Sequence, residues 1–337
     1  MISRIVAGSA AIGARFDRSV IPLRFASSVA DIRRPSLGKL VRAAAVGVRL
    51  AGHLVRRRPD LVYLTLSLDG SAFYRDCVYV AMVKLAGRPH VFHLHTQLPR
   101  RAPGALHRWV FADAHVIMLA RTLGGNVTDR ARSVRFVANG VADVAPTQAH
   151  TRTTSGPPRV LFLSHVSESK GPLVLLDALA TLASRGVPFR ATFAGADGGC
   201  LTRFRSRVLE LGLAEVVDYV GPAYDGAKHA LFADHDLFVL PSANEAFPLV
   251  VLEAMMWALP VVATRVGAVG EIVIDGETGA LVPAGDSASL AHALEAYLGS
   301  PEMRASHGAH GRARFSEKFT QARFETELVE ALSECLA

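Results

Sequence analysis

Two glutamates stand eight positions apart in the segment EAFPLVVLEA (245–254). Glu245 follows the loop-like stretch LPSAN, and Glu253 lies inside the apolar run LVVLEAMMWAL. A carboxylate in such surroundings is costly to bury unless another group pairs with it. Because a carboxylate repels phosphate and only accepts hydrogen bonds, we expect both side chains to hold hydroxyl groups of a ligand. The alternative is a surface glutamate in a loop and a helical glutamate paired with a basic neighbour.

The residues between the two glutamates predict the start of a helix. LFVLPS (237–242) is typical of a strand, and PLVVLEAMMWA (248–258) has a helical pattern with Pro248 at its first position, which proline suits. The free N–H groups and the dipole of a helix start favour phosphate. A ligand with hydroxyl groups on both sides of a diphosphate is a nucleotide sugar, in which the ribose lies on one side and the transferred sugar on the other. The expected donor-binding residues at this helix start are Ala246, Phe247, Pro248, Leu249 and Val250.

A cation and two glycines lie beside other expected helix starts. In FLSHVSESKG (162–171) a strand ends, a polar loop follows, and Lys170 and Gly171 open a helix, so Lys170 is placed to give a positive charge to a diphosphate. A solvated lysine is the alternative. In VGAVGEIVIDGETGALVPAGD (266–286), Gly267 and Gly270 permit close backbone approach before a short helix. An ordinary tight turn is the alternative there.

Short β-branched runs alternate with helical patterns along the chain, which argues for βαβ units and parallel sheets. Ligands of such sheets bind beyond the carboxyl ends of the strands. The expected strands are residues 60–67, 90–95, 114–119, 134–138, 159–164, 190–195, 216–221, 237–242, 260–264 and 279–283.

The segment APTQAHTRTTSGPP (145–158) has the composition of a linker. We therefore expect an α/β protein of two doubly wound parallel-sheet domains, residues 1–150 and 151–318, facing a cleft that holds the active site. Residues 319–337 are expected to form a last helix.

The charge is distributed unevenly along the 337 residues. Residues 1–150 hold 22 Lys and Arg against eight Asp and no Glu, whereas the remaining residues hold 15 against 22 acidic residues. This asymmetry suggests that the N-terminal half faces an anionic partner. The three cysteines, an odd number without metal-type spacing, fit free thiols in a reducing cytoplasm. The opening MISRIVAGSAAIGARF is read as a soluble helix rather than a signal peptide, because its apolar part is short and interrupted by glycine.

The segment PSANEAFPLVVLEAMMWALPVVATRVGAVGEIVIDGETGALVPAGD (241–286) resembles the signature region of glycosyltransferase family 4. The similarity extends over most of residues 60–300 and includes VANGV (137–141) and FLSHVSESKG. It implies a retaining hexosyltransferase of the GT-B fold, with two Rossmann-like domains and a nucleotide-sugar donor.

The resemblance also implies roles for single residues. Glu245 would contact the donor sugar, Glu253 the ribose hydroxyls, and Lys170 would neutralise the leaving diphosphate. His95 in HLHT would lie beside the reacting sugar. Asn139 in VANGV would also bind the donor. In this fold the last helix crosses back to the N-terminal domain and couples domain closure.

Three positions depart from the family's pattern. His165 stands where the family usually has arginine, so diphosphate binding is expected to be weaker there or supported elsewhere, since histidine is largely neutral near pH 7. Gly270 stands where proline is common. Residues 1–16 resemble the helix after the family's first glycine-rich turn, and RSVIPLRF (18–25) resembles its second strand. The first strand is therefore expected to be missing, or to be encoded upstream.

The histidines give a further expectation. His93 and His95 alternate along one strand and are expected to face opposite sides of the sheet, with His95 on the ligand side. A buried histidine bonded to the backbone is the alternative. A zinc site from His93, His95, His107 and His115 fits no metal-ligand spacing, so no metal site is expected.

The segment 37–60 is predicted to form one helix with a basic face. Arg42, Arg49 and Arg56 recur every seven residues, with Lys39 beside them. On the other side are Leu40, Val48, Ala51 and Val55. A basic amphipathic helix suits peripheral contact with anionic lipid at the inner membrane face. A solvated basic face is the alternative, and nucleic acid is disfavoured because no aromatic residues are interleaved.

No cofactor is expected beyond a UDP- or GDP-linked sugar, and no metal, because no Asp-x-Asp clamp stands out. The acceptor is expected to be a glycan or a lipid-linked molecule, in the cytoplasmic assembly of a bacterial surface polysaccharide or glycolipid. The alternatives are a non-catalytic protein that binds a nucleotide sugar or a partner, and a sugar-nucleotide epimerase.

Overall fold

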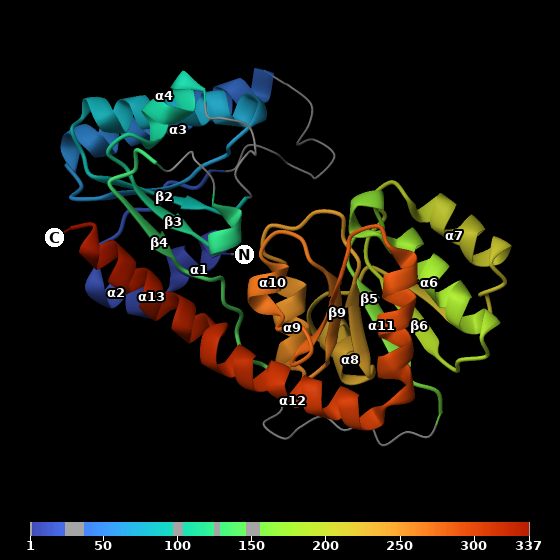
Figure 1. Ribbon diagram of the computed structural model, residues 1–337. Helices are drawn as coiled ribbons and strands as arrows, with labels where there is room; N and C mark the ends of the chain where they lie inside the picture. The colour runs from blue at the N-terminus through green and yellow to red at the C-terminus, as the bar shows by residue number, and fades with distance from the viewer. Residues whose placement is uncertain (1, 24–36, 97–103, 125–128, 146–155, 337) are drawn as a thin grey trace. The chain divides into compact units, whose positions relative to one another are not determined.

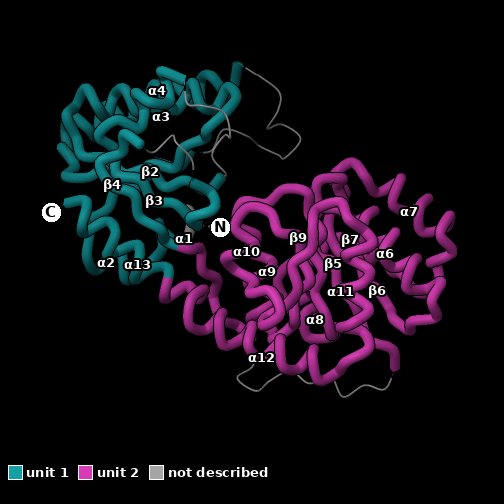
Figure 2. Tube along the Cα trace, viewed as in Figure 1, with its two compact units in different colours: residues 1–137, 324–337 teal, residues 138–323 magenta. Residues whose placement is uncertain are grey.

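The computed structural model describes residues 2–23, 37–96, 104–124, 129–145 and 156–336 (Figure 1). The chain divides into two compact units, residues 1–137 with 324–337 and residues 138–323 (Figure 2). The division falls at residue 137 rather than near residue 150. The division falls before Val141 because the backbone of this residue bonds to Phe319 and Gln321, which belong to unit 2. Residues 146–155 of the expected linker lie outside the described residues.

Unit 1 contains a parallel sheet whose four described strands follow the order of the chain. Each overlaps a strand expected from the sequence, because short apolar runs covered on both faces are typical of parallel strands. The strands are β1 (Val62–Thr65), β2 (His90–Leu94), β3 (His115–Met118) and β4 (Ser133–Phe136).

Helices cover both faces of this sheet (Figure 1). On one face, α3 (Leu37–Arg56) and α4 (Gly70–Leu85) pack on β1 through a cluster that includes Leu50, Val62 and Val83. On the other face, α2 (Ala10–Arg15) and α13 (Gln321–Glu334) meet β2 and β3 through a second apolar cluster. The last helix is therefore part of the core of unit 1. A short helix, α5 (Ala105–Phe111), precedes β3.

The buried side of α3 differs from the expectation. Val46, Leu50 and Leu54 face the sheet, whereas Leu40, Val48 and Val55, which were expected to fill that side, are exposed. Helical periodicity shows which residues share a face but does not show which face is buried.

The N-terminal segment is helical as expected, in two pieces. Helix α1 (Ile2–Gly8) ends before Ser9. Ser9 is the N-cap of α2, and its side chain accepts a hydrogen bond from Ile12 N. The strand expected at 18–25 is wrong for residues 18–23, which form no ladder but pack Ile21 and Leu23 against the α3 side of the core. Residues 24 and 25 lie outside the described residues.

Unit 2 contains a parallel sheet of six strands in the order β10-β9-β8-β5-β6-β7. All six were expected from the sequence. They are β5 (Arg159–Leu163), β6 (Arg190–Ala194), β7 (Val217–Gly221), β8 (Leu237–Leu240), β9 (Val261–Thr264) and β10 (Gly279–Val282).

The helices of unit 2 also cover both faces of the sheet. On one face α6 (Pro172–Ser184), α7 (Leu201–Glu210) and α11 (Ser287–Gly299) share a single apolar core with β5 and β6. On the other face lie α8 (Asp225–Ala233), α9 (Leu249–Met256) and α12 (Pro301–Lys318). The short helix α10 (Val269–Ile272) follows β9.

No helix in the described part of the chain is both long enough and apolar enough to cross a membrane. The three cysteines, Cys77, Cys200 and Cys335, are buried free thiols.

Candidate functional site

The candidate site lies where the strand order of unit 2 reverses. The chain runs from β5 to β6 and β7 in one direction, then returns to the other side of β5 for β8, β9 and β10. The loop after β5 leads to α6 on one face of the sheet, and the loop after β8 leads to α9 on the other. Neighbouring loops that part in this way leave a crevice at the carboxyl ends of the strands, which is where ligands of such sheets bind.

Lys170 and Glu245 meet at this reversal. Lys170 closes a 3-10 turn (Glu168–Lys170) after β5, and Glu245 lies in the loop after β8. The Lys170 Nζ is 2.7 Å from Glu245 Oε1, and the Ser242 hydroxyl donates to the same oxygen at 2.7 Å. Glu245 is only 8% exposed, so the alternative of a surface glutamate is wrong. The pair places a cation and a hydrogen-bond acceptor side by side.

Glycine allows the two loops to touch. Ala243 N donates to Ser169 O at 2.8 Å. A Cβ on Gly171, whose φ is +71°, would lie 2.1 Å from Pro241 O, closer than any real contact. The left-handed backbone and the missing side chain at residue 171 therefore hold Lys170 beside Glu245.

A second glycine supports Glu245 from the loop after β9. Gly267 has a φ of +51°, and a Cβ there would lie 1.8 Å from Glu245 O. Ala268 N donates to Ala246 O at 2.9 Å. The expected close approach is confirmed for Gly267. For Gly270 it is wrong, because this residue lies within α10 and a Cβ would meet only side-chain atoms at ordinary distance.

Glu253 is paired with a residue that sequence reasoning missed. Lys228 on α8 donates to Glu253 Oε1 at 2.6 Å, and both side chains are mostly buried. This pairing is the alternative considered for the helical glutamate, and it provides the partner that a buried carboxylate requires. A signal was present, because the chain has only five lysines beside its many arginines, and Lys170 and Lys228 are two of them.

The helix between the two glutamates begins one residue later than expected. Pro248 is the N-cap, with a ψ of 107°, and the helix begins at Leu249. Phe247 is buried and packs edge-on against Phe319 at a centroid distance of 6.2 Å, so its side chain belongs to the core. The N–H groups of Leu249 and Val250 lie in the first turn, where a helix offers donors to an anion.

His165 and Asn139 differ from the other donor candidates. His165 is exposed in the loop that carries Lys170. Asn139 is 4% exposed, and its Oδ1 is buried without a hydrogen-bond partner within the described ranges. The structure thus gathers Lys170, Glu245 and Ser242, whereas no hydrogen bond or ion pair among the described residues joins His165 or Asn139 to them.

His93 and His95 lie on the same side of β2 in unit 1. Their ring centroids are 4.2 Å apart, so the expectation that they face opposite sides is wrong. Side chains two positions apart on a strand point to the same face. His93 is fully buried and its Nδ1 bonds to the Tyr63 hydroxyl at 2.6 Å. Burial lowers the pKa of His95 to about 4, so this imidazole is neutral near pH 7.

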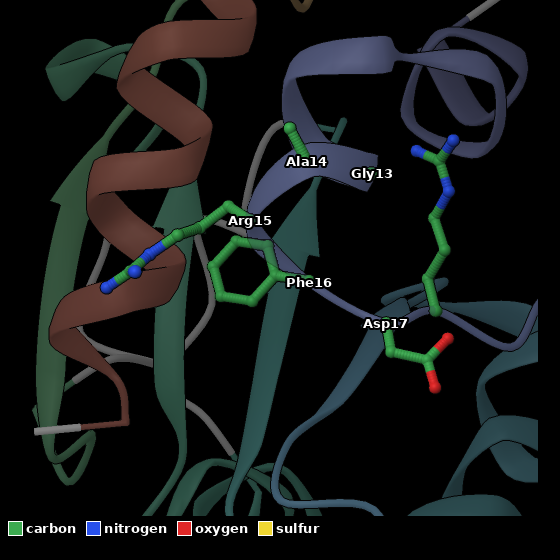
Figure 3. A pocket seen from close by; sticks show the side chains of 6 residues that line it. Gly13, Ala14, Arg15, Phe16 and Asp17 are labelled. Carbon is green, nitrogen blue, oxygen red and sulfur yellow. The ribbon is translucent and has the colours of Figure 1, made fainter.

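A surface pocket of unit 1 is distinct from this site. It is lined by residues 13–18, which follow one another along the chain from α2 (Figure 3). The lining gathers no side chains from separate elements, and we assign it no role. Within the described residues, no group of three or more histidine, cysteine or acidic side chains is arranged to hold a metal ion.

Residues 146–314, half of the chain, match the family of glycosyl transferases group 1. The chain belongs to this family. The matched region contains β5 to β10 and every residue of the Lys170–Glu245 and Lys228–Glu253 pairs.

Two relatives show how far the similarity of this chain extends. A D-inositol 3-phosphate glycosyltransferase of Arthrobacter sp. is 36% identical over 169 residues, which are 49% of this chain and 39% of the relative. A phosphatidyl-myo-inositol mannosyltransferase of Mycobacterium leprae is 31% identical over 242 residues, which are 68% of this chain and 63% of the relative. The chain spans about two fifths of the length of the first of these relatives.

Solved structures share the fold of this chain. HepE of Anabaena, crystallised in complex with UDP, has a TM-score of 0.69 at 25% identity, over 89% of this chain and 84% of that chain. A glycosyltransferase from Rickettsia africae has a TM-score of 0.74 at 16% identity, over 90% and 84%. The two parallel-sheet α/β units thus have the GT-B fold.

Proposed function

We propose that the protein transfers a sugar from a nucleoside-diphosphate sugar to a hydroxyl group, with retention at the anomeric carbon. The observation that carries this proposal is the Lys170–Glu245 pair at the strand reversal of unit 2. A sugar phosphate presents anionic oxygens next to hydroxyl groups. A lysine and a carboxylate in contact match these two features, the lysine for phosphate and the carboxylate for hydroxyls.

The proposed chemistry breaks the bond between the anomeric carbon and the diphosphate oxygen and forms a bond to the acceptor oxygen. Negative charge develops on the leaving diphosphate, whose departing oxygen takes the proton that the acceptor hydroxyl loses. Lys170 and the first turn of α9 would stabilise that charge, the electrostatic contribution that usually dominates in such sites. Because these groups would balance the charge, we propose that transfer needs no metal ion and no cofactor other than the donor.

The two glutamates would orient the donor. When phosphate oxygens draw Lys170 toward them, Glu245 would accept hydrogen bonds from hydroxyl groups of the sugar in place of the ammonium group. Glu253 would accept from the ribose, with Lys228 keeping its charge balanced. His95 would lie beside the reacting sugar as a neutral hydrogen-bonding group.

The similar proteins support a narrower proposal for the substrates. HepE was crystallised with UDP, and the relative from M. leprae is named for a lipid acceptor, phosphatidyl-myo-inositol. We propose a UDP- or GDP-linked donor and a glycan or lipid-linked acceptor, used in bacterial surface polysaccharide or glycolipid assembly. The reaction would take place in the cytoplasm, at the inner face of the membrane.

The test is release of nucleoside diphosphate from UDP-glucose, UDP-galactose and GDP-mannose in the presence of EDTA. Bacterial lipid extract and soluble oligosaccharides would serve as acceptors, and NMR would give the anomeric configuration of the product. We expect acceptor-dependent release from one donor with retained configuration. A strict requirement for Mn²⁺ would contradict the metal-free proposal. Donor binding without turnover would favour the non-catalytic alternative, and conversion of the donor without an acceptor would favour the epimerase.

A further inference from the structure

We propose that the outer face of α3 and α4 docks on the surface of an anionic lipid membrane. The inference deepens the proposed function by naming the surface that meets lipid. It rests on the proposed function in one respect: a lipid-linked acceptor would give the protein a reason to approach a membrane.

Helix α3 carries an apolar stripe on its exposed side. Leu37, Val41, Val48 and Val55 are separated by four, seven and seven residues, which places them within about 40° of one another around a helix of 3.6 residues per turn. Their exposed fractions are 80%, 68%, 73% and 74%. A soluble helix normally turns such a stripe toward the core, so this stripe is available to a partner.

Helix α4 extends the same surface. Tyr74, Val78 and Leu85 are all more than half exposed, and α4 lies beside α3 on one face of the sheet (Figure 1). The Tyr79 hydroxyl donates to Ala43 O at 2.9 Å, which joins the two helices beneath the exposed residues. Two adjacent helices thus each carry exposed apolar side chains along the side turned away from their shared core, more than isolated surface side chains would make.

The charges beside this face indicate which kind of partner binds there. Arg42, Arg49 and Arg56 repeat every seven residues and form a row along one edge of the α3 stripe, and residues 37–58 contain no Asp or Glu. The one acidic residue of α4, Asp76, is buried and bonded to Arg75. An apolar stripe edged by arginines fits a helix that lies in the headgroup region of an anionic bilayer.

A second copy of the chain fits less well. A twofold contact through this face would place its arginine rows in an interface to which residues 37–58 bring no carboxylate, and unpaired like charges in an interface are unfavourable. The geometry therefore points to lipid.

Flotation of the full chain with vesicles tests the proposal without any enzyme activity. We expect binding to vesicles of phosphatidylcholine with phosphatidylglycerol, and at least tenfold weaker binding to pure phosphatidylcholine. The double variant Val48→Gln/Val55→Gln should weaken binding at least tenfold. The triple variant Arg42→Gln/Arg49→Gln/Arg56→Gln should lose about a hundredfold on anionic vesicles, because each basic residue near the surface contributes roughly 1 kcal/mol.

Leu209→Gln is the matched control, because Leu209 is 72% exposed on α7 of unit 2 and should not affect binding. Equal binding to both vesicle types, or an equal loss in the Leu209 variant, would overturn the proposal. So would light scattering that showed a dimer of the wild type and a monomer of the Val48→Gln/Val55→Gln variant. If flotation behaves as expected but no sugar transfer is found, the docking surface stands and only the proposed reaction fails.

Discussion

Two of the five lysines of this chain lie in the candidate site, each in contact with a glutamate. A lysine beside a mostly buried carboxylate does two things. It offsets the cost of burying the negative charge, and it leaves a cation at the place where a phosphate would enter. At the scale of single residues, the proposed function therefore depends on charge pairs that a bound ligand would rearrange.

Replacement of Lys170 tests the role of its charge. We expect Lys170→Met to lower kcat/KM by roughly a hundredfold to a thousandfold, the usual loss when a group that stabilises developing negative charge is removed. Lys318→Met removes a lysine of similar length from an exposed pair with Glu317 and should leave kcat/KM unchanged. The double variant Lys170→Met/Glu245→Gln removes both charges, so it should regain thermal stability but not activity. Full activity of Lys170→Met would show that its charge is not used.

The pKa of His95 predicts a pH dependence of stability. Burial holds this pKa at about 4 in the folded chain, below its ordinary value of 6.5. The unfolded chain therefore binds the proton more readily, so this contribution to stability is complete above pH 6.5 and is lost as the pH falls toward 4. Between pH 7 and pH 5, the loss for this residue is about 2 kcal/mol.

Urea unfolding at pH 7 and pH 5 measures this effect. In His95→Asn, whose side chain does not ionise, the free energy of unfolding should fall by roughly 2 kcal/mol less between the two pH values than in the wild type. An identical fall in both proteins would show that His95 is not held neutral by the fold.

At the scale of elements, the sequence was informative wherever an element is buried on both sides. Each of the ten strands expected from short β-branched runs overlaps an observed strand, because a covered parallel strand requires a short, continuous apolar run. The strand expected at 18–25 from the family resemblance is wrong for residues 18–23. The buried face of α3 was not predictable, because the helix has apolar residues on two sides and only packing selects between Leu50 and Val48. A basic partner for Glu253 was considered from the sequence, but the sequence did not identify it as Lys228, since the contact joins two helices that only the fold brings together.

The glycine at the start of α6 gives a sharp test of the loop arrangement. Gly171 and Gly186 flank this helix with nearly equal φ values of +71° and +73°, but only Gly171 is pressed against another backbone atom, Pro241 O. Gly186→Ala should cost roughly 1 to 2 kcal/mol of stability for the left-handed conformation alone. Gly171→Ala should cost more and should also weaken nucleotide binding, because Lys170 would be displaced. Equal thermal shifts and equal nucleotide affinities in the two variants would contradict the packing of the loops.

At the scale of the whole molecule, the last segment of the chain completes the core of the first unit. Phe324 and Leu328 of α13 are buried in the cluster with Val91 and Ile117. The linker composition at 145–158 did not reveal where the units divide, because the division depends on backbone bonds of Val141 with a segment far along the chain.

Truncation of Leu328 tests this dependence. Leu328→Ala leaves a cavity in the core of unit 1 and should destabilise it by roughly 2 to 5 kcal/mol. Leu336→Ala, at a position 44% exposed, should have a much smaller effect. Calorimetry should show a lower unfolding temperature for one transition of Leu328→Ala, with the transition stabilised by nucleotide unchanged. A shift of the nucleotide-stabilised transition alone would contradict the assignment of α13 to unit 1.

The central claim is that the strand reversal of unit 2 binds a nucleoside diphosphate between Lys170 and the two glutamates. Calorimetric titration of UDP and of GDP into the full chain, without metal, tests it most directly, with Glu253→Ala and the exposed Glu317→Ala as matched variants. We predict micromolar binding of one nucleotide, weakened at least tenfold by Glu253→Ala and unaffected by Glu317→Ala. Absence of binding by both nucleotides to the folded wild type, or equal affinity in Glu253→Ala, would contradict the claim.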